Sequence, residues 1–316
     1  MQREIRIYSG SANPQLSADI AKYLDLELGK VKIERFPDGE VFVQFKDNLR
    51  SDDIFIIQPT CSPTNDNLME LLIMIDAARR ASAAKITAVL PYFGYARQDR
   101  KDRPRVPITA KLVANLLTAA GVDRVITMDL HAQQIQGFFD IPVDHLYAAL
   151  VMVPCLKEKM GKGSVVVAPD TGSVKMGMAY SDMLNAGFAV VAKRRIDAES
   201  VESSHLVGDV KGRTCLIVDD LTSTAGTLLA AAEQLKAHGA GKIYVAVSHC
   251  LLNDKGRDRL RDSDIIENMV TTDGVPLEDD LDGKIIRLSI APLLGEAIRR
   301  IHDGESVSSL FVVNKD

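Results

Sequence analysis

The chain has 316 residues, of which 46% are hydrophobic and 26% are charged, and its formal net charge is −5. This length is enough for two ordinary domains, each with its own core, and the hydrophobic content excludes a disordered chain. The acidic balance argues against a general nucleic-acid binder, which needs a basic face to displace counterions. Small anionic ligands need only local basic residues, so the composition does not exclude them.

The sequence predicts a cytoplasmic protein with no membrane span. The N-terminal segment 1–7 carries charges where a signal peptide needs an apolar core, and no apolar stretch is long enough to cross a bilayer. The cysteines lie far apart with no Cys-x-x-Cys pair, which favours neither a zinc site nor a redox motif. They are Cys61, Cys155, Cys215 and Cys250.

Strand-like and helical patterns alternate along the chain, which predicts an α/β fold with largely parallel sheets. In the first half we expect a helix at 68–80 and strands at 5–8, 31–36, 41–45, 54–57, 86–90 and 124–128. The turn signal Pro37-Asp38-Gly39 predicts a β-hairpin between two of these strands. The charged stretch 97–105 is interrupted by Pro104 and is expected to be a loop.

In the second half the same alternation continues and indicates a duplication. We expect strands at 165–168, 188–192, 214–218, 243–247 and 310–313, and helices at 228–238 and 294–302. The strand, helix and strand from 54 to 90 resemble those from 215 to 247, although any two βαβ units look alike at this level. The sequence therefore predicts two domains, 1–146 and 147–316.

The segment 214–227 is the most informative part of the chain. An apolar run ends in Asp219 and Asp220, and a loop rich in small and hydroxyl residues then opens a helix. A helix N-terminus offers unpaired N–H groups to a phosphate, and Gly226 allows close backbone approach. The paired carboxylates could hold ribose hydroxyls or a phosphate-bound Mg²⁺. The pattern thus favours a sugar-phosphate site over an acidic helix cap.

Two further residues follow strands at positions where open α/β sheets bind ligands. His131 comes after the strand 124–128 and Asp170 after the strand 165–168, so the two side chains could share a metal. A lone histidine is more often structural, and histidine is not a usual Mg²⁺ ligand. The helix start after Asp170 could form a second anion cradle, for a pyrophosphate, although this signal is weak.

These segments together resemble the ribose-phosphate pyrophosphokinase family, whose type I phosphoribosyltransferase fold carries the signature seen at 214–227. The stretches that match the family in order are 35–40 (Arg-Phe-Pro-Asp-Gly-Glu), 91–101, 128–139, Lys193-Arg194-Arg195 and 214–227. The resemblance covers nearly the whole chain. It implies two tandem phosphoribosyltransferase-like domains, the first a degenerate copy, with 296–316 returning to the first domain.

By this resemblance, each site residue receives a role. The catalytic cations are Lys193 and Arg195. The ATP contacts are Phe36, Asp38, Glu40, Arg97, Gln98 and His131. The ribose 5-phosphate contacts are Asp219, Asp220, Ser223, Thr224, Ala225, Gly226 and Thr227. The metal ligands for Mg²⁺ are His131 and Asp170. Two residues depart from the family pattern, Ser173 replacing a common glycine and Ser223 a common acidic residue.

The implied reaction is transfer of the β,γ-diphosphoryl group of ATP to the 1-hydroxyl of ribose 5-phosphate, which gives 5-phosphoribosyl 1-pyrophosphate and AMP for nucleotide biosynthesis. In the family the hairpin residues reach the site of a neighbouring subunit, so a homo-oligomer, by resemblance a hexamer, is expected. The alternatives are a phosphoribosyltransferase, which shares the 219–227 signature, and a catalytically silent regulatory subunit. The basic and acidic site residues are all present, which argues against the silent subunit.

Overall fold

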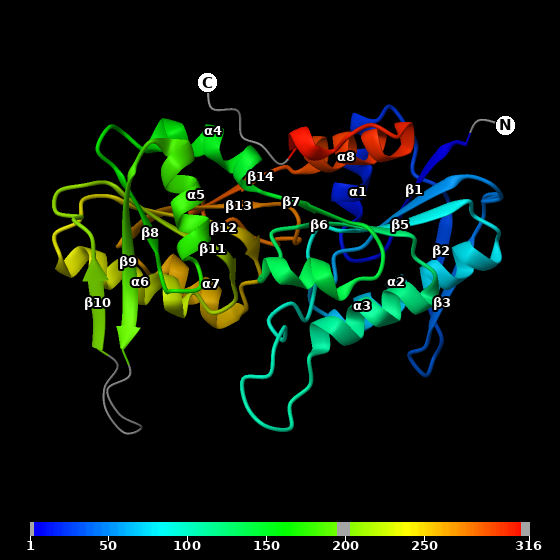
Figure 1. Ribbon diagram of the computed structural model, residues 1–316, viewed down its shortest axis with the longest axis horizontal. Coiled ribbons are helices and arrows are strands. Elements are labelled where there is room, and N and C mark those ends of the chain that lie inside the picture. Colours follow the sequence, from blue (N-terminus) through cyan, green and yellow to red (C-terminus); the bar gives the residue numbers. More distant parts are fainter. Residues whose placement is uncertain (1–2, 195–202, 311–316) are drawn as a thin grey trace. The chain divides into compact units, whose positions relative to one another are not determined.

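The computed structural model describes residues 3–194 and 203–310, and these residues form two compact units, each with its own sheet (Figure 1). The first unit contains residues 3–147, 274–276 and 289–310, and the second contains the rest of the described chain. The predicted α/β class with largely parallel sheets is confirmed. Within the described residues, no helix combines the length and the apolar character needed to cross a membrane.

The first unit is built on a parallel sheet in the order β1-β4-β5-β6-β7. Its strands are β1 (Ile5–Ser9), β4 (Asp53–Ile57), β5 (Lys85–Leu90), β6 (Arg124–Met128) and β7 (Val143–Leu146). Every residue of β4 is buried, as expected for a strand covered on both faces. Ile54 and Ile56 face the core under α2 (Thr64–Arg80) and α3 (Thr109–Ala120).

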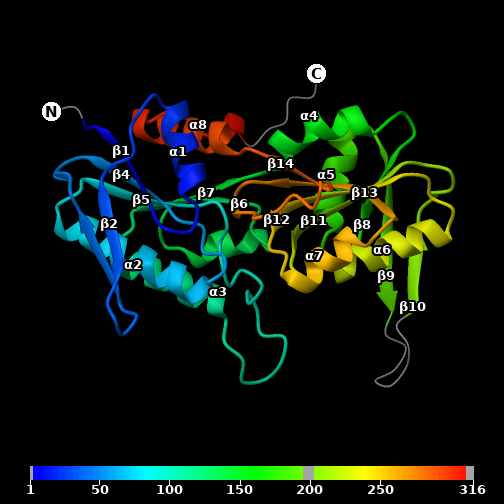
Figure 2. The ribbon, with the colours of Figure 1, turned by 180° about the vertical axis from the view of Figure 1, so that it is seen from behind.

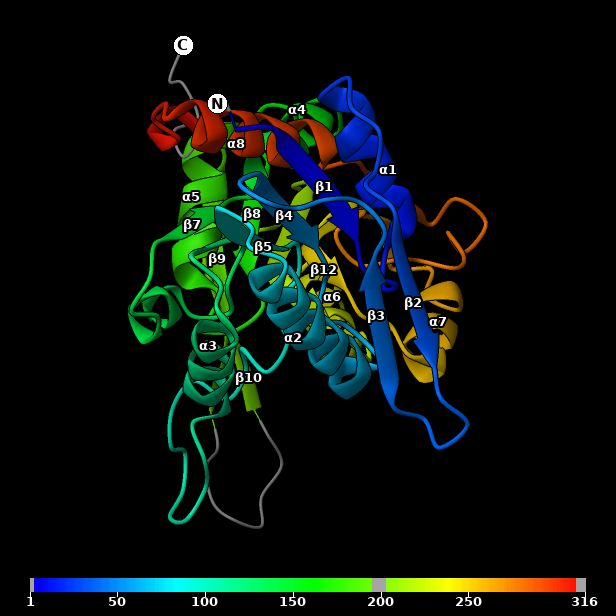
Figure 3. The same ribbon diagram turned by 90° about the vertical axis from the view of Figure 1, so that its right-hand side faces the viewer.

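Helices α1 (Pro14–Tyr23) and α8 (Ala291–Asp303) pack side by side on the other face of this sheet (Figure 3). Their contact requires Gly295, because a Cβ there would lie 2.4 Å from the ring of Tyr23. At the end of α8, His302 Nδ1 lies 3.0 Å from a carboxylate oxygen of Asp53. The C-terminal helix is thereby attached to the first unit.

The predicted hairpin forms a ribbon of its own, made of β2 (Val31–Arg35) and β3 (Val41–Phe45), and it packs beside α2 (Figure 2). Its turn contains Gly39 at φ +96°, a conformation that favours glycine. Phe45 contacts Tyr8 edge to face, with ring centroids 4.6 Å apart. The ribbon is therefore joined to the core of the first unit at the end opposite the turn.

The sheet of the second unit has the order β10-β9-β8-β11-β12-β13-β14, with β10 antiparallel to β9. Its strands are β8 (Val165–Ala168), β9 (Gly187–Arg194), β10 (Ser203–Val207), β11 (Cys215–Thr222), β12 (Ile243–Cys250), β13 (Ile266–Thr272) and β14 (Ile285–Leu288). Figures 1 and 2 show α4 (Ala149–Lys159) and α5 (Val174–Leu184) on one face and α6 (Gly226–Ala237) and α7 (Asp254–Arg261) on the other.

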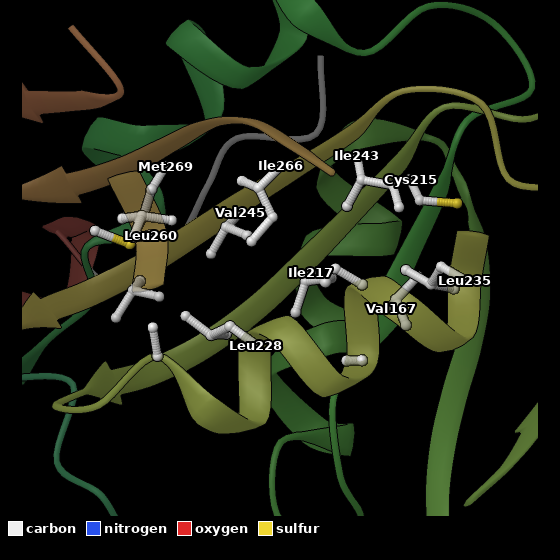
Figure 4. Close-up of a cluster of buried hydrophobic side chains, with 14 of the residues drawn as sticks. Val167, Cys215, Ile217, Leu228, Leu235, Ile243, Val245, Leu260, Ile266 and Met269 are labelled. Atoms are coloured by element: carbon white, nitrogen blue, oxygen red, sulfur yellow. The ribbon is translucent and has the colours of Figure 1, made fainter. Parts of the chain in front are cut away.

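Alternate residues of the central strands build the core under α6 and α7 (Figure 4). Ile217 and Val245 point toward Leu228 and Leu235 of α6, and Leu260 of α7 closes the same cluster. The buried strands read as continuous apolar runs because the intervening residues face the opposite helices. This core fixes the start of α6 at the end of β11, where the sugar-phosphate loop was predicted.

The two units share an order of strands. Across the sheet of the first unit, the spatial order of the strands is β1-β4-β5-β6-β7. Across the sheet of the second unit, the strands β8-β11-β12-β13-β14 follow one another in the corresponding order. A helix joins β4 to β5, as another joins β11 to β12. This correspondence is what the predicted duplication requires, and it extends beyond the single βαβ unit on which that prediction rested.

Some predicted boundaries were wrong. The strand expected to end at residue 218 continues to Thr222, because β11 pairs with β12 as far as Cys250. The strand expected to end at 192 continues to Arg194, so Lys193 lies within β9 and not after it. Leu310, expected to begin a strand, ends a short 3₁₀ helix (Ser308–Leu310), and 311–313 lie outside the described residues.

Candidate functional site

The segment 223–227, called here the loop 223–227, runs from the end of β11 into the first turn of α6 in the conformation expected of an anion-binding helix start. Ala225 has φ +54° and immediately precedes the first residue of α6, Gly226. Within the described chain, no backbone or side-chain acceptor takes the N–H groups of Thr224, Ala225, Gly226 and Thr227. These N–H groups and the positive end of the helix dipole lie together at the carboxyl end of β11. The loop can therefore hold a phosphate group.

Asp219 lies close to this loop near the end of β11. Its Oδ1 accepts hydrogen bonds from the Ser173 hydroxyl at 2.8 Å and from the backbone N–H of Asp220 at 3.0 Å. The pKa of Asp219 is raised to about 7, mainly by burial and also by the charges of Asp220 and Asp170, while the Ser173 hydrogen bond acts in the opposite direction. A bound cation or ribose hydroxyl donors would favour its ionised form.

The loop after β8 brings Asp170 to the same part of the second unit. Its Oδ1 accepts from the N–H of Gly172 at 2.8 Å and from the N–H of Ser173 at 3.1 Å. The second anion cradle expected here stays a prediction, since these two N–H groups donate to the carboxylate of Asp170 within the loop itself.

Ser173 connects the two loops of the second unit. Its hydroxyl lies 3.2 Å from Asp170 Oδ1 and 2.8 Å from Asp219 Oδ1, so one side chain joins carboxylates 49 positions apart in sequence. The sequence showed only that a serine stands where the resembling family commonly has glycine. The sequence did not predict that Ser173 links the two carboxylates. Its only signal was the serine at a position where the family commonly has glycine.

The equivalent position in the first unit is closed by side chains. Gln58 directly follows β4, is fully buried, and accepts from the Ala12 N–H at 3.0 Å. Glu70 of α2 is also buried and accepts from the Gln58 amide at 2.8 Å, from the Ser11 N–H at 2.6 Å and from the Ser11 hydroxyl at 2.7 Å. A position filled by a carboxylate and an amide does not favour a phosphate, and the degenerate nature of the first copy stays a prediction.

The hairpin residues predicted to contact ATP lie at the tip of the β2-β3 ribbon. Phe36 is half-exposed and meets Phe42 edge to face, with ring centroids 5.8 Å apart. The side chain of Asp38 accepts from the Glu40 N–H at 3.2 Å, and Phe36 N–H bonds to the Glu40 carbonyl at 2.9 Å. The tip is thus an ordered turn that presents one aromatic face and two carboxylates, as predicted.

The loop that carries Arg97 and Gln98 contacts the segment that carries His131. Asp99 accepts from the side-chain amide of Gln134 at 3.0 Å, and Gln98 accepts from the Thr109 hydroxyl at 2.6 Å. Arg97 is exposed. The structure therefore brings together two of the predicted nucleotide segments, one following β5 and the other following β6.

His131 is exposed at the end of a sharp turn after β6. Asp129 makes this turn; its side chain is buried and its backbone has φ +36°. A hydrogen bond from the Leu130 N–H to His145 Nε2, at 2.9 Å, stabilises the turn. His131 belongs to the first unit and Asp170 to the second, so their shared metal stays a prediction. Arg195 lies outside the described residues, and of Lys193 only the backbone in β9 is described.

The chemistry of the second unit suits Mg²⁺. Asp170, Asp219 and Asp220 supply carboxylate oxygens, the donors that this ion prefers. Among the described residues, no cluster of three or more His, Cys, Asp or Glu side chains is arranged to hold a metal by itself. Mg²⁺ usually retains waters and takes phosphate oxygens, so an incomplete protein shell fits this ion when a phosphorylated substrate completes the coordination.

Comparison with known proteins identifies relatives over the full length of the chain. Residues 5–121 match the family model described as the N-terminal domain of ribose phosphate pyrophosphokinase, and residues 201–312 match the phosphoribosyl synthetase-associated domain. The chain is 51% identical to the ribose-phosphate pyrophosphokinase of Bordetella pertussis, over 96% of this chain and 99% of that protein. It is 49% identical to that of Campylobacter jejuni, over 98% of this chain and 100% of that protein.

A solved structure agrees with these relatives. The crystal structure of phosphoribosylpyrophosphate synthetase from Mycobacterium smegmatis matches with a TM-score of 0.90 and 40% sequence identity. The match covers 96% of this chain and all of that one. Both units described above are therefore found in a protein of known structure.

Proposed function

The chain belongs to the ribose-phosphate pyrophosphokinase family, and from that premise we propose how it carries out the family reaction. It is a transferase that moves the β,γ-diphosphoryl group of ATP to the 1-hydroxyl of ribose 5-phosphate, with AMP as the second product. The product serves nucleotide biosynthesis. The observation that carries this proposal is the free N–H cradle at 224–227 beside the carboxylates of Asp219 and Asp220.

In the second unit, the loop 223–227 binds the 5-phosphate and the adjacent carboxylates bind the ribose. The unpaired N–H groups and the hydroxyls of Ser223, Thr224 and Thr227 donate to the phosphate oxygens. Asp219 and Asp220 accept from the ribose hydroxyls, which orients the 1-hydroxyl for attack. Ser173 keeps Asp219 in place through its 2.8 Å hydrogen bond.

In the first unit, the hairpin and the loops after β5 and β6 bind ATP. Phe36 offers an aromatic face for adenine, and Asp38 and Glu40 offer carboxylates for its amino hydrogens. Arg97, Gln98 and His131 contact the nucleotide. Because the hairpin tip is exposed, it can reach a nucleotide bound on a neighbouring subunit, and we propose a homo-oligomer, by family resemblance a hexamer, located in the cytoplasm.

The chain's own groups position the substrates and stabilise charge during transfer. Lys193 and Arg195 stabilise negative charge on the transferred oxygens and on departing AMP. Mg²⁺, held by Asp170 and His131, would neutralise phosphate charge and polarise the attacking hydroxyl. The bond that forms joins the sugar oxygen to the β-phosphorus, and the bond that breaks joins that phosphorus to the AMP oxygen. No general base is assigned.

Two other functions fit the chain less well. A phosphoribosyltransferase shares the 219–227 signature, but such enzymes commonly need one domain of this kind, whereas this chain matches full-length two-domain synthetases. A catalytically silent regulatory subunit would be expected to lose acidic or basic site residues, and Asp219, Asp220, His131, Lys193 and Arg195 are all present.

The test is AMP release by the purified chain with ATP and Mg²⁺, with and without ribose 5-phosphate. Only the proposed reaction makes AMP formation depend on this sugar phosphate, with one 5-phosphoribosyl 1-pyrophosphate formed per AMP. Pyrophosphate release that requires a nucleobase would indicate the phosphoribosyltransferase instead. A folded chain that binds nucleotide but forms no AMP under any metal or phosphate condition would contradict the proposal.

A further inference from the structure

We infer that α7 and its N-cap residue hold the loop 223–227 in its phosphate-binding conformation, so that Asn253, Gly256 and Arg259 are positioning residues for the sugar phosphate. The inference rests on the proposed assignment of this loop to ribose 5-phosphate. None of the three residues was singled out from the sequence. The only sequence signal is a glycine inside a short, highly charged helix.

Two hydrogen bonds join α7 to the loop, one from its N-cap residue and one from a side chain of the helix. The backbone N–H of Asn253 donates to the Ser223 carbonyl at 3.0 Å, and Arg259 Nη1 donates to the Thr224 carbonyl at 3.2 Å. The N-cap residue of α7 and a side chain from its second half therefore bind two successive carbonyl groups of the loop.

These two hydrogen bonds determine where the loop's N–H groups point. In a planar trans peptide, the C=O of one residue and the N–H of the next point in opposite directions. Because the carbonyls of Ser223 and Thr224 point to α7, the N–H groups of Thr224 and Ala225 point away from it. Both belong to the set of N–H groups that no acceptor takes within the described residues. The two hydrogen bonds from α7 thus orient the N–H groups of Thr224 and Ala225 toward the proposed phosphate.

Gly256 lets the loop lie directly on the helix. A Cβ at this position would lie 2.7 Å from the Ser223 carbonyl oxygen and 3.1 Å from the Thr224 Cα, both backbone atoms that cannot rotate away. Gly256 is buried, and its own N–H is bonded to the Asn253 side chain at 2.9 Å. Glycine weakens a helix relative to alanine, so its presence here indicates a packing requirement. Any larger residue would push the loop away.

Arg259 adds a positive charge beside the loop. Its Nη1 lies 3.4 Å from the point where a Cβ on Gly226 would stand, so the guanidinium is next to the first turn of α6 as well as to Thr224. The side chain is exposed, so its effect on a phosphate dianion is screened by salt. Its hydrogen bond to the carbonyl is the larger contribution to positioning.

The experiment compares steady-state kinetics of Gly256→Ala, Arg259→Ala and Arg259→Lys with those of the unmodified chain. For Gly256→Ala we expect the KM for ribose 5-phosphate to rise about tenfold or more, and for Arg259→Ala about fivefold, with partial recovery in Arg259→Lys. The KM for ATP should change less than twofold. The thermal midpoint of Gly256→Ala should fall by a few degrees, because the added Cβ meets backbone atoms of the loop.

Two control variants match these changes. Gly161→Ala adds a Cβ where nothing lies within 4 Å, and Lys255→Ala removes an exposed cation of α7 that makes no hydrogen bond or ion pair within the described residues. Both should leave the KM for ribose 5-phosphate unchanged. If Gly256→Ala fails to fold, the comparison of Arg259→Ala with Arg259→Lys decides whether α7 positions the loop.

The outcomes separate this inference from the proposed function. An active unmodified chain whose Gly256 and Arg259 variants keep a normal KM for ribose 5-phosphate would overturn the role of α7 alone. Equal rises of the KM for ATP and for ribose 5-phosphate would also overturn it, because they would indicate general damage. An unmodified chain with no sugar-dependent AMP formation would remove the proposed function and, with it, this inference.

Discussion

The substitution Asp219→Asn tests the electrostatics of the site directly, because it removes a charge and little else. Asparagine keeps an Oδ1 that can accept from the Ser173 hydroxyl and the Asp220 N–H, the two bonds that Asp219 makes. Burial is the largest cause of the raised Asp219 pKa, and the charge of Asp220 is the next. The ligand-free protein should therefore become more stable as it loses activity, as expected where charges are assembled for binding.

The size and the pH dependence of this gain in stability follow from the difference between the Asp219 pKa in the folded and in the unfolded state. The Asp219 pKa rises from its ordinary value of 3.8 to about 7 in the folded protein. A raised acid pKa means that the folded state binds the proton more tightly, so stability is lost as pH rises from about 4 to about 7. At 1.36 kcal/mol per pKa unit the cost is about 4 kcal/mol at pH 8 and about 2 kcal/mol at pH 5. Asp219→Asn should recover these amounts.

The assay is thermal unfolding of the ligand-free, metal-free protein at pH 5 and pH 8, with Asp182→Asn as the control, an exposed carboxylate on α5. We expect the midpoint of Asp219→Asn to rise by several degrees at pH 8 and by about half as much at pH 5. The control should not shift at either pH. An equal gain at both pH values, or no gain at pH 8, would refute the reasoning. Activity should fall about 100-fold.

Three further changes test other parts of the molecule. Phe36→Ala should raise the KM for ATP about tenfold and leave that for ribose 5-phosphate unchanged, while Phe36→Tyr should restore it; steady-state kinetics with each substrate varied will decide. Lys193→Ala should lower turnover about 100-fold or more with the KM for ribose 5-phosphate nearly kept, and near-normal turnover would exclude its catalytic role. Glu70→Ala should lower the free energy of unfolding by about 2 kcal/mol in a urea titration, because the buried Gln58 amide and the Ser11 N–H and hydroxyl lose their acceptor; an unchanged midpoint would contradict that account.

The parts of the fold that the sequence predicted are those determined by local pattern. The apolar runs at β4 and β8 and the turn around Gly39 were found because burial, periodicity and turn chemistry act over a few residues. The loop before α6 was predicted for the same reason, since small and hydroxyl residues at a helix start leave a composition signal, and its binding of a phosphate stays a prediction. The functions of individual site residues rest on resemblance and remain proposals.

Strand ends could not be predicted from pattern. Asp219 and Asp220 have low strand propensity, which placed the end of the strand at residue 218. Pairing with β12 carries β11 on to Thr222, because the neighbouring strand supplies hydrogen-bond partners that the sequence does not show. Tertiary pairing overrode local preference at the site itself.

The sequence by itself determined the α/β class, the hairpin and the loop that can hold a phosphate, since each depends on residues close together in the chain. Only the tertiary structure decided how that loop is supported. Ser173 meets Asp219 across two loops, and Gly256 lies against Ser223 from a separate helix. These contacts join residues more than 30 positions apart, and such contacts arise from packing around a shared core, which leaves no periodic or compositional trace in the sequence.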